Sequence, residues 1–113
     1  MPRYSGPLDP YSAAAVLGRR PGNYVIRYDD GTAYVGRQGR TTNRIATHVR
    51  NAPDEVVAVH FMHDGEDDIC VRARREAHTI SSLLDAGVTL RNQREAAQPE
   101  ACLLDTGTRR RRR

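Results

Sequence analysis

Hydrophobic and polar residues follow strand spacing in the first half of this chain. Residues 23–28 read Asn-Tyr-Val-Ile-Arg-Tyr, a run rich in β-branched and aromatic side chains. The turn-forming sequence Asp-Asp-Gly follows at residues 29–31, and strand-forming residues resume at 32–35. Two such runs joined by a tight Asp-Gly turn predict a β-hairpin.

A third strand and a long helix are predicted further along. Residues 56–62 are almost continuously apolar, which is typical of a strand covered on both faces. From residue 68 onward the apolar residues recur at intervals of three and four, which predicts an amphipathic helix that stops at Gly87. These apolar positions are Ile69, Ala73, Ala77, Ile80, Leu83 and Leu84.

Two shorter helices complete the predicted order. Ser12 as N-cap and Gly18 as stop predict one to two helical turns between them. Thr41 or Thr42 is expected to cap a second helix over residues 43–50. The resulting order, β-β-α-β-α after the first short helix, predicts an α+β fold: a small antiparallel sheet of about three strands, flanked by helices.

The length of 113 residues allows one domain of ordinary size. We expect a lead segment with a short helix at 1–21, the folded domain at 22–95 and a loose tail at 96–113. No apolar run approaches the roughly 18 residues that a membrane-spanning helix needs, and no secretory signal is recognised at the N-terminus. We therefore expect no membrane insertion, and action in the cytoplasm.

The charge of the chain is unevenly distributed. All 18 basic residues apart from histidine are arginines, against 14 acids, and residues 109–113 supply five of them. Residues 31–50 carry four arginines and no acid, which should attract phosphate, although exposed arginines on a solvated helix are also common. These four residues are Arg37, Arg40, Arg44 and Arg50. The cysteines Cys70 and Cys102 have no zinc-ligand spacing, and we expect free thiols.

Glu76 is the residue whose position most needs an explanation. It lies on the apolar stripe of the long helix, between Ala73 and Ile80. A carboxylate there must be ion-paired, hydrogen-bonded or bound to a cation, because desolvation is costly. An ion pair with Arg72, or with an arginine of the other helix, is the simplest structural explanation.

Other candidate residues have ordinary explanations when each is considered alone. Tyr24 and Tyr34 lie on the hairpin strands, where tyrosine is common. Arg44 and His48 are four residues apart and project from one side of the predicted second helix. Asn92 follows a short apolar stretch and could serve as a turn residue.

The order of these residues resembles that of the GIY-YIG nuclease superfamily. Gly-x-Tyr stands at residues 22–24, Tyr-Val-Gly at 34–36 and Arg-x-x-x-His at 44–48, followed by Glu76 on a later helix and by Asn92. The similarity spans residues 22–94. Asn23 departs from the pattern, since that position usually carries a bulky aliphatic residue.

The resemblance implies a three-stranded antiparallel sheet flanked by helices and the cleavage of DNA with one divalent cation, magnesium or manganese. It assigns Glu76 as the metal ligand and Arg44 to the scissile phosphate, chemistry that suits both side chains. Tyr24 and Tyr34 would position or deprotonate the attacking water, with His48 accepting the proton or activating a tyrosine. Asn92 would orient Glu76 or a phosphate.

Two functional hypotheses follow. The first is a metal-dependent DNA endonuclease of low sequence specificity, because no recognition module accompanies the catalytic unit. Such a nuclease could act as a delivered toxin, with an immunity protein as its partner, or belong to a phage or mobile element. The alternative is a non-catalytic nucleic-acid-binding module that uses the arginine-rich face and tail. The oligomeric state is left open.

Overall fold

A computed structural model describes residues 3–92 of the chain. Its sheet has four antiparallel strands in the order β1-β4-β2-β3. They are β1 (Ser5–Leu8), β2 (Gly22–Tyr28), β3 (Ala33–Gln38) and β4 (Val56–His63). The predicted hairpin is confirmed as β2 and β3, which pair from Gly22 opposite Gln38 to Arg27 opposite Ala33. The α+β class is likewise confirmed.

The sheet has one strand more than the sequence predicted. β1 pairs with β4 through Ser5 opposite Phe61 and Leu8 opposite Val59, with an irregular register between them. Its sequence, Ser-Gly-Pro-Leu, has no β-branched or aromatic residue, so no strand signal was visible. Because β4 supplies the pairing partners, tertiary context decides the conformation here.

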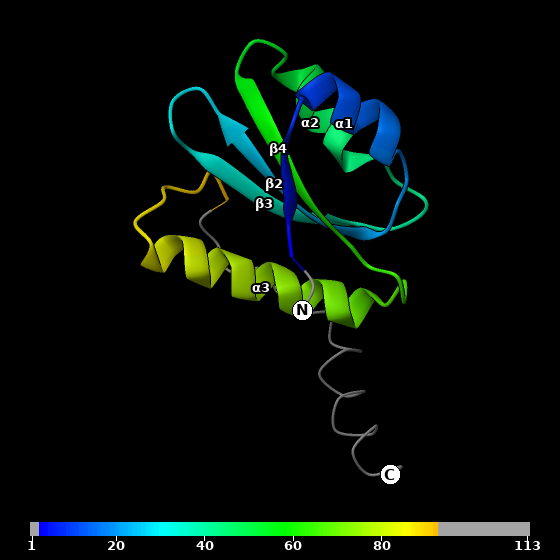
Figure 1. The fold of residues 1–113 in the computed structure, drawn as a ribbon. Coiled ribbons are helices and arrows are strands. Elements are labelled where there is room, and N and C mark those ends of the chain that lie inside the picture. The colour runs from blue at the N-terminus through cyan, green and yellow to red at the C-terminus, as the bar shows by residue number, and fades with distance from the viewer. Residues whose placement is uncertain (1–2, 93–113) are drawn as a thin grey trace.

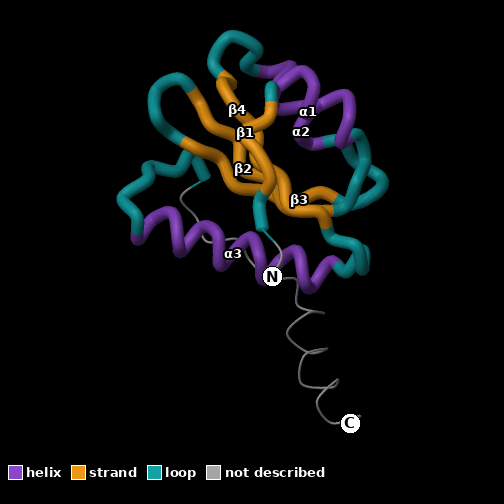
Figure 2. The backbone as a smooth tube through the Cα atoms, viewed as in Figure 1, coloured by secondary structure: helices purple, strands orange, loops and turns teal. Residues whose placement is uncertain are grey.

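Three helices cover the two faces of the sheet (Figures 1 and 2). α1 (Pro10–Leu17) and α2 (Arg44–Asn51) pack on one face, and α3 (Ile69–Asp85) lies across the other. Among the described residues, no helix is long and apolar enough to cross a membrane.

The helix starts differ from the predicted ones in detail. Asp9, one turn before Ser12, caps α1 by accepting a hydrogen bond from the Ser12 amide. Asn43 caps α2 by accepting from Ala46, in place of the two threonines before it. Asp, Asn, Ser and Thr are all good N-caps, so the local sequence could not separate neighbouring candidates. The predicted α3 start is confirmed, with Asp68 as its cap.

Each face of the sheet has its own apolar core. The first core joins α1 and α2 to the sheet and includes Tyr24, Ile26 and Ile45, all fully or almost fully buried. The second lies under α3 and includes Val35 and Ile80. Side chains alternate between the faces of a strand, so β2 contributes to both cores.

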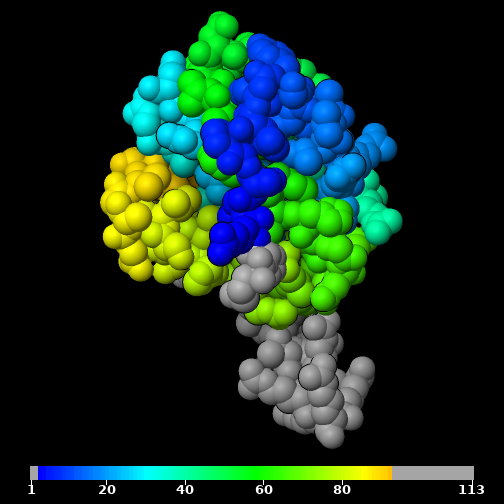
Figure 3. Space-filling view, in the orientation of Figure 1, coloured from blue at the N-terminus to red at the C-terminus, as the bar shows by residue number. Residues whose placement is uncertain are grey.

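The N-terminal segment ties the sheet to α3. In the space-filling view it runs along the surface beside β4 down to α3 (Figure 3). The Tyr4 hydroxyl lies 2.8 Å from that of Thr79 on α3, in a hydrogen bond that either can donate. This contact closes one end of the layer between α3 and the sheet.

A buried ion pair fixes the start of α3. Arg72 donates to Asp64 at 2.9 Å and to Asp67 at 3.0 Å, and the side chains of Arg72 and Asp64 are almost completely buried. The Arg72 carbonyl accepts a hydrogen bond from the Asn23 amide nitrogen at 2.8 Å. Asn23 therefore bonds β2 to α3, which accounts for a polar side chain where the related motif has an aliphatic one.

Two expectations concern the C-terminal part of the chain. Cys70 is disulfide-bonded, which corrects the free thiol expected at this residue. Cys102 lies outside the described residues. The end of the predicted domain and the tail at 96–113 lie outside the described residues.

Replacing Asp64 should test the structural role of this ion pair. Asp64→Ala leaves Arg72 buried with only Asp67 as its acidic partner, and the loss in free energy of unfolding should be about 3 kcal/mol. Urea denaturation followed by circular dichroism measures it. The control is Asp30→Ala, which breaks an exposed pair with Arg91 and exposed hydrogen bonds from Thr32, and should lower the midpoint much less. Equal losses in the two variants would contradict a special role for Asp64.

Candidate active site

A cavity of about 420 Å³ lies at the edge of the sheet beside β3. Four of the six predicted catalytic residues line it: Tyr24, Tyr34, Arg44 and Glu76. They come from β2, β3, α2 and α3. The fold thus brings together residues up to 52 positions apart in the sequence, from 24 to 76.

The tyrosines and Glu76 approach the cavity from opposite faces of the sheet. Tyr24 belongs to the core under α1 and α2, whereas Glu76 is on α3. Tyr24 is paired with Gly36 across the strands, and a Cβ atom at residue 36 would overlap the end of its ring. The ring therefore extends over the backbone of β3 to the sheet edge, because Gly36 leaves that space open.

The glycine of the first motif is also required by close packing. A Cβ atom at Gly22 would overlap the main-chain oxygen of Met62 and the ring of Phe61 on β4. Each motif glycine thus permits a close approach, one to β4 and the other to the Tyr24 ring.

His48 lies behind the two tyrosines, in contact with both. Its Nε2 atom is 3.2 Å from the Tyr24 hydroxyl, and its ring centroid is 4.3 Å from that of Tyr34. The Tyr24 and Tyr34 rings are stacked, with centroids 6.4 Å apart. The three rings form one cluster on the α2 side of the cavity.

The Tyr24–His48 hydrogen bond joins a neutral phenol to a neutral imidazole. Burial raises the pKa of the Tyr24 hydroxyl above its ordinary value, and Tyr34 adds to the shift. Burial lowers the pKa of His48, and the charge of Arg44 lowers it further. In the neutral tautomer whose Nε2 carries no hydrogen, His48 accepts from the Tyr24 hydroxyl, and in the other tautomer its Nε2 donates to the Tyr24 oxygen.

Glu76 is ion-paired, but with a partner that the sequence did not predict. Its Oε1 atom accepts a hydrogen bond from Arg37 on β3 at 2.8 Å, while Arg72 pairs with Asp64 and Asp67. The Glu76 side chain is 11% exposed and that of Arg37 is 26% exposed. Burial raises the pKa of the Glu76 carboxyl, and the charges of Arg37 and Arg44 offset this only in part.

The chemistry of this carboxylate is compatible with a divalent cation. Glu76 Oε2 receives no hydrogen bond from the described residues, and the carboxylate is short of compensating positive charge. The described residues contain no group of three or more acids, histidines or cysteines that could form a full protein cage. Magnesium commonly uses one or two carboxylates with water and phosphate, so Glu76 alone suffices as protein ligand.

The main chain of β3 adds polar groups to the cavity. Ala33 and Val35 direct their N–H and C=O groups away from β2, toward the segment that follows α3. Because strands alternate with a period of two, Arg37 directs its main-chain groups the same way. Arg37 lines the cavity, so its N–H is available there to an anion.

Asn92 occupies a different place from the other predicted residues. Its side-chain amide accepts from the Val35 N–H at 3.1 Å and donates to the Val35 carbonyl, which mimics a neighbouring strand. It does not line the cavity or bond to Glu76. In this structure, Asn92 closes the sheet edge next to the cavity.

Of the three predicted DNA-binding arginines, only Arg37 lines the cavity. Arg40 forms an exposed ion pair with Asp67 at 2.9 Å. Arg50 is exposed near the end of α2, beside Thr47.

Gln38 positions Arg44, although sequence reasoning missed it. Its side chain is almost fully buried and its Oε1 accepts from the main-chain amides of Arg44 and Ile45. Its Nε2 donates to the carbonyls of Gly18 and Arg20. A polar residue at the end of a strand is normally exposed, so the residue type gave no sign of burial. The only sequence signal was that Gln38 stands just before the predicted start of α2, whose first amides it binds.

No family model, curated protein or solved structure matches this chain.

Replacing Gly36 should displace Tyr24. The methyl group of Gly36→Ala overlaps the Tyr24 ring, and overpacking of this kind costs about 1–3 kcal/mol in free energy of unfolding. In a Tyr24→Ala background the same change should cost much less, which a double-mutant cycle measures by urea denaturation. Gly65→Ala, where nothing lies within 4 Å of the added atom, serves as the control. Additive losses would contradict the close approach.

Acidification should destabilise the fold through His48. Its folded pKa lies below the ordinary 6.5, so the unfolded chain binds the proton first as the pH falls. The free energy of unfolding therefore drops between pH 6.5 and the folded pKa. The difference in free energy of unfolding between the parent and His48→Asn should favour the parent more at pH 7 than at pH 5. The neighbouring Thr47→Ala should show no such difference, and a pH-independent effect of His48→Asn would exclude this titration.

Proposed function

We propose that this chain is a metal-dependent endonuclease of the GIY-YIG type that hydrolyses phosphodiester bonds in DNA. The observation that carries the proposal is the meeting of Tyr24, Tyr34, Arg44 and Glu76 at one cavity, with His48 in contact with both tyrosines. These are the residues that the order of motifs singles out. Chance would not place members of four separate elements around one cavity at the sheet edge.

The Tyr24–His48 pair supplies a route for the proton of the attacking water. Tyr24 lines the cavity and keeps its own proton, while His48 is neutral and, in the tautomer whose Nε2 carries no hydrogen, accepts from it. As water attacks phosphorus, its proton passes to the Tyr24 oxygen and the Tyr24 proton passes to His48 Nε2. The phosphorus bond to the leaving oxygen breaks, and that oxygen takes a proton from solvent. Tyr24 is thus unchanged at the end of the step.

Arginine side chains provide the electrostatic support. Arg44 lines the cavity with an exposed side chain, and its charge acts on both His48 and Glu76. A guanidinium presents two parallel donors to phosphate oxygens and stabilises the added negative charge of the transition state. The main-chain N–H of Arg37 offers a further donor at the same cavity. Arg40 and Arg50 extend the positive surface toward flanking phosphates.

Glu76 is the residue that would hold the divalent cation. Bound there, the cation would polarise the phosphate and offset the charge of the carboxylate. The Arg37 contact holds one carboxylate oxygen in place and leaves the other for this role. Low sequence specificity remains part of the proposal, because the roles assigned to the residues that line the cavity concern phosphate, water and a cation rather than base edges.

A non-catalytic nucleic-acid-binding module is the alternative, and one contact favours it. The ion pair with Arg37 already satisfies Glu76 in part, so a purely structural carboxylate would look similar. The two functions differ in what the loss of Glu76 does to cleavage.

Glu76→Gln should separate catalysis from stability. The change removes the charge that a divalent cation requires, so magnesium-dependent nicking of supercoiled plasmid should fall about a hundredfold or more. The pKa of the Glu76 carboxyl is raised above its ordinary 4.5, so the ionised carboxylate costs the folded protein free energy at pH 7. The neutral glutamine removes this cost, and the variant should be as stable as the parent at pH 7 or more stable. Affinity for DNA, measured in chelator, should be retained or increased.

The matched control is Glu66→Gln, in the exposed loop before α3. It should nick plasmid at the parent rate. A folded Glu76→Gln protein that nicks near the parent rate would exclude Glu76 as the metal ligand. A parent protein that binds DNA but does not nick it with magnesium or manganese would favour the binding module.

A further inference from the structure

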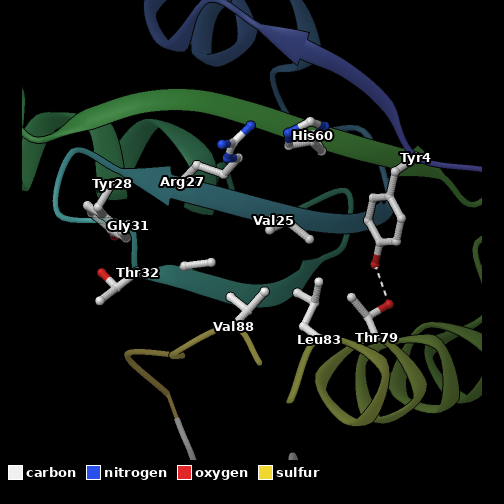
Figure 4. Close-up of a pocket in the computed structure, with 11 residues that line it drawn as sticks. Tyr4, Val25, Arg27, Tyr28, Gly31, Thr32, His60, Thr79, Leu83 and Val88 are labelled. Carbon is white, nitrogen blue, oxygen red and sulfur yellow. Dashed lines mark hydrogen bonds between the residues drawn. The ribbon is translucent and has the colours of Figure 1, made fainter. Parts of the chain in front are cut away.

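A second cavity, of about 400 Å³, lies between α3 and the sheet, away from the proposed catalytic residues. Val25 and Ala33 face it from the sheet, and Leu83 and Val88 face it from α3 and the chain beyond. Figure 4 shows Arg27 and His60 on the wall opposite Leu83 and Val88. This volume falls within the roughly 300–1,000 Å³ range of small-molecule sites.

The cavity is bounded because three segments meet around it. Gly87, at a φ of +85°, turns the chain after α3, and Leu90 then pairs with Ala33 at the sheet edge. At the other end, the Tyr4 hydroxyl bonds to Thr79 and closes the gap between β1 and α3 (Figure 4). Small side chains on β2 and β3 leave the space between these boundaries unfilled.

The walls of this cavity are chiefly apolar, with one strong positive charge. The side chain of Arg27 forms no ion pair or hydrogen bond with any other described residue, and the residue is exposed. Its charge reaches His60, whose pKa it lowers after the larger effect of burial. The two side chains are therefore neighbours, and an anion beside them would be attracted to the charge of Arg27 and could accept a hydrogen bond from the neutral His60 ring.

We propose that this cavity binds a small organic anion with a flat apolar body and a carboxylate head. The apolar body would lie between Val25, Leu83 and Val88, and the carboxylate would bond to Arg27. A nucleotide fits less well, because these walls offer few partners for the polar edge of a base. The site is separate from the cavity at Glu76 and does not depend on the proposed nuclease function.

Binding by the intact chain can be tested without DNA or metal. The probes are 2-naphthoate, 2-naphthalenemethanol and 2-naphthylmethylammonium, which share an apolar body and differ in charge. Naphthoate should bind about tenfold more tightly than the alcohol, and the ammonium should bind weakest. Amide shifts in a nitrogen-15 NMR titration should be largest at Val25, Ala33, Leu83 and Val88.

Arg27→Gln tests the anion contact directly. It should weaken naphthoate binding about tenfold and leave the affinity for the alcohol unchanged, a pattern that mere loss of structure does not produce. The matched control is Arg50→Gln, on α2 at the opposite face, which should alter neither affinity.

Three results would overturn the proposal. They are equal affinities of the parent for all three probes, shifts that map to another surface, and tighter binding of thymidine 5′-monophosphate than of naphthoate. The probe series uses the parent protein, so it decides the matter even if the Arg27→Gln protein fails to fold. Because cleavage is not measured, a negative result here leaves the proposed nuclease function untouched.

Discussion

Tyr24 reaches the cavity only because Gly36, its partner on the edge strand, has no side chain. Alternation along a strand assigns each residue to one face of the sheet, and Tyr24 belongs to the face opposite α3. Its ring nevertheless extends over Gly36 to the open edge, where Glu76 arrives from the other face. The meeting of the two groups, the hydrogen bond to His48 and the proton route built on it all depend on this crossing.

The electrostatics of the site place positive charge around a single buried acid. Arg37, Arg44 and Arg72 line the cavity with Glu76, but Arg72 is committed to Asp64 and Asp67. Burial still outweighs the remaining arginines at Glu76, as the raised pKa of its carboxyl shows. A cation bound beside Glu76, as proposed, would favour the charged form of this carboxyl. An incoming phosphate would in turn satisfy the exposed guanidinium of Arg44.

The sequence predicted the α+β class, the hairpin and the long helix, because local spacing determines them. The sequence also predicted that Tyr24, Arg44 and Glu76 form one site, but only through the order of the motifs. Hydrophobic periodicity by itself gives no sign that residues on separate elements meet. The partner of Glu76 could not be read, because Arg37 lies 39 residues away and meets it only through packing of α3 on the sheet. The role of Gln38 could not be predicted either, because its hydrogen bonds to Gly18, Arg20 and Arg44 form only when separate segments pack together.

The capping of Val35 by Asn92 also bears on the solubility of the folded protein. An exposed strand edge invites pairing with the edge of another molecule, and natural sheets are protected by short or covered edges. Here the outer strand β1 has only four residues, while the segment from Thr89 to Asn92 covers the first half of β3. The uncovered stretch borders the cavity beside positively charged arginines. If two copies paired along this edge, their arginines would repel one another. The edge beside the cavity can therefore stay exposed and still resist aggregation.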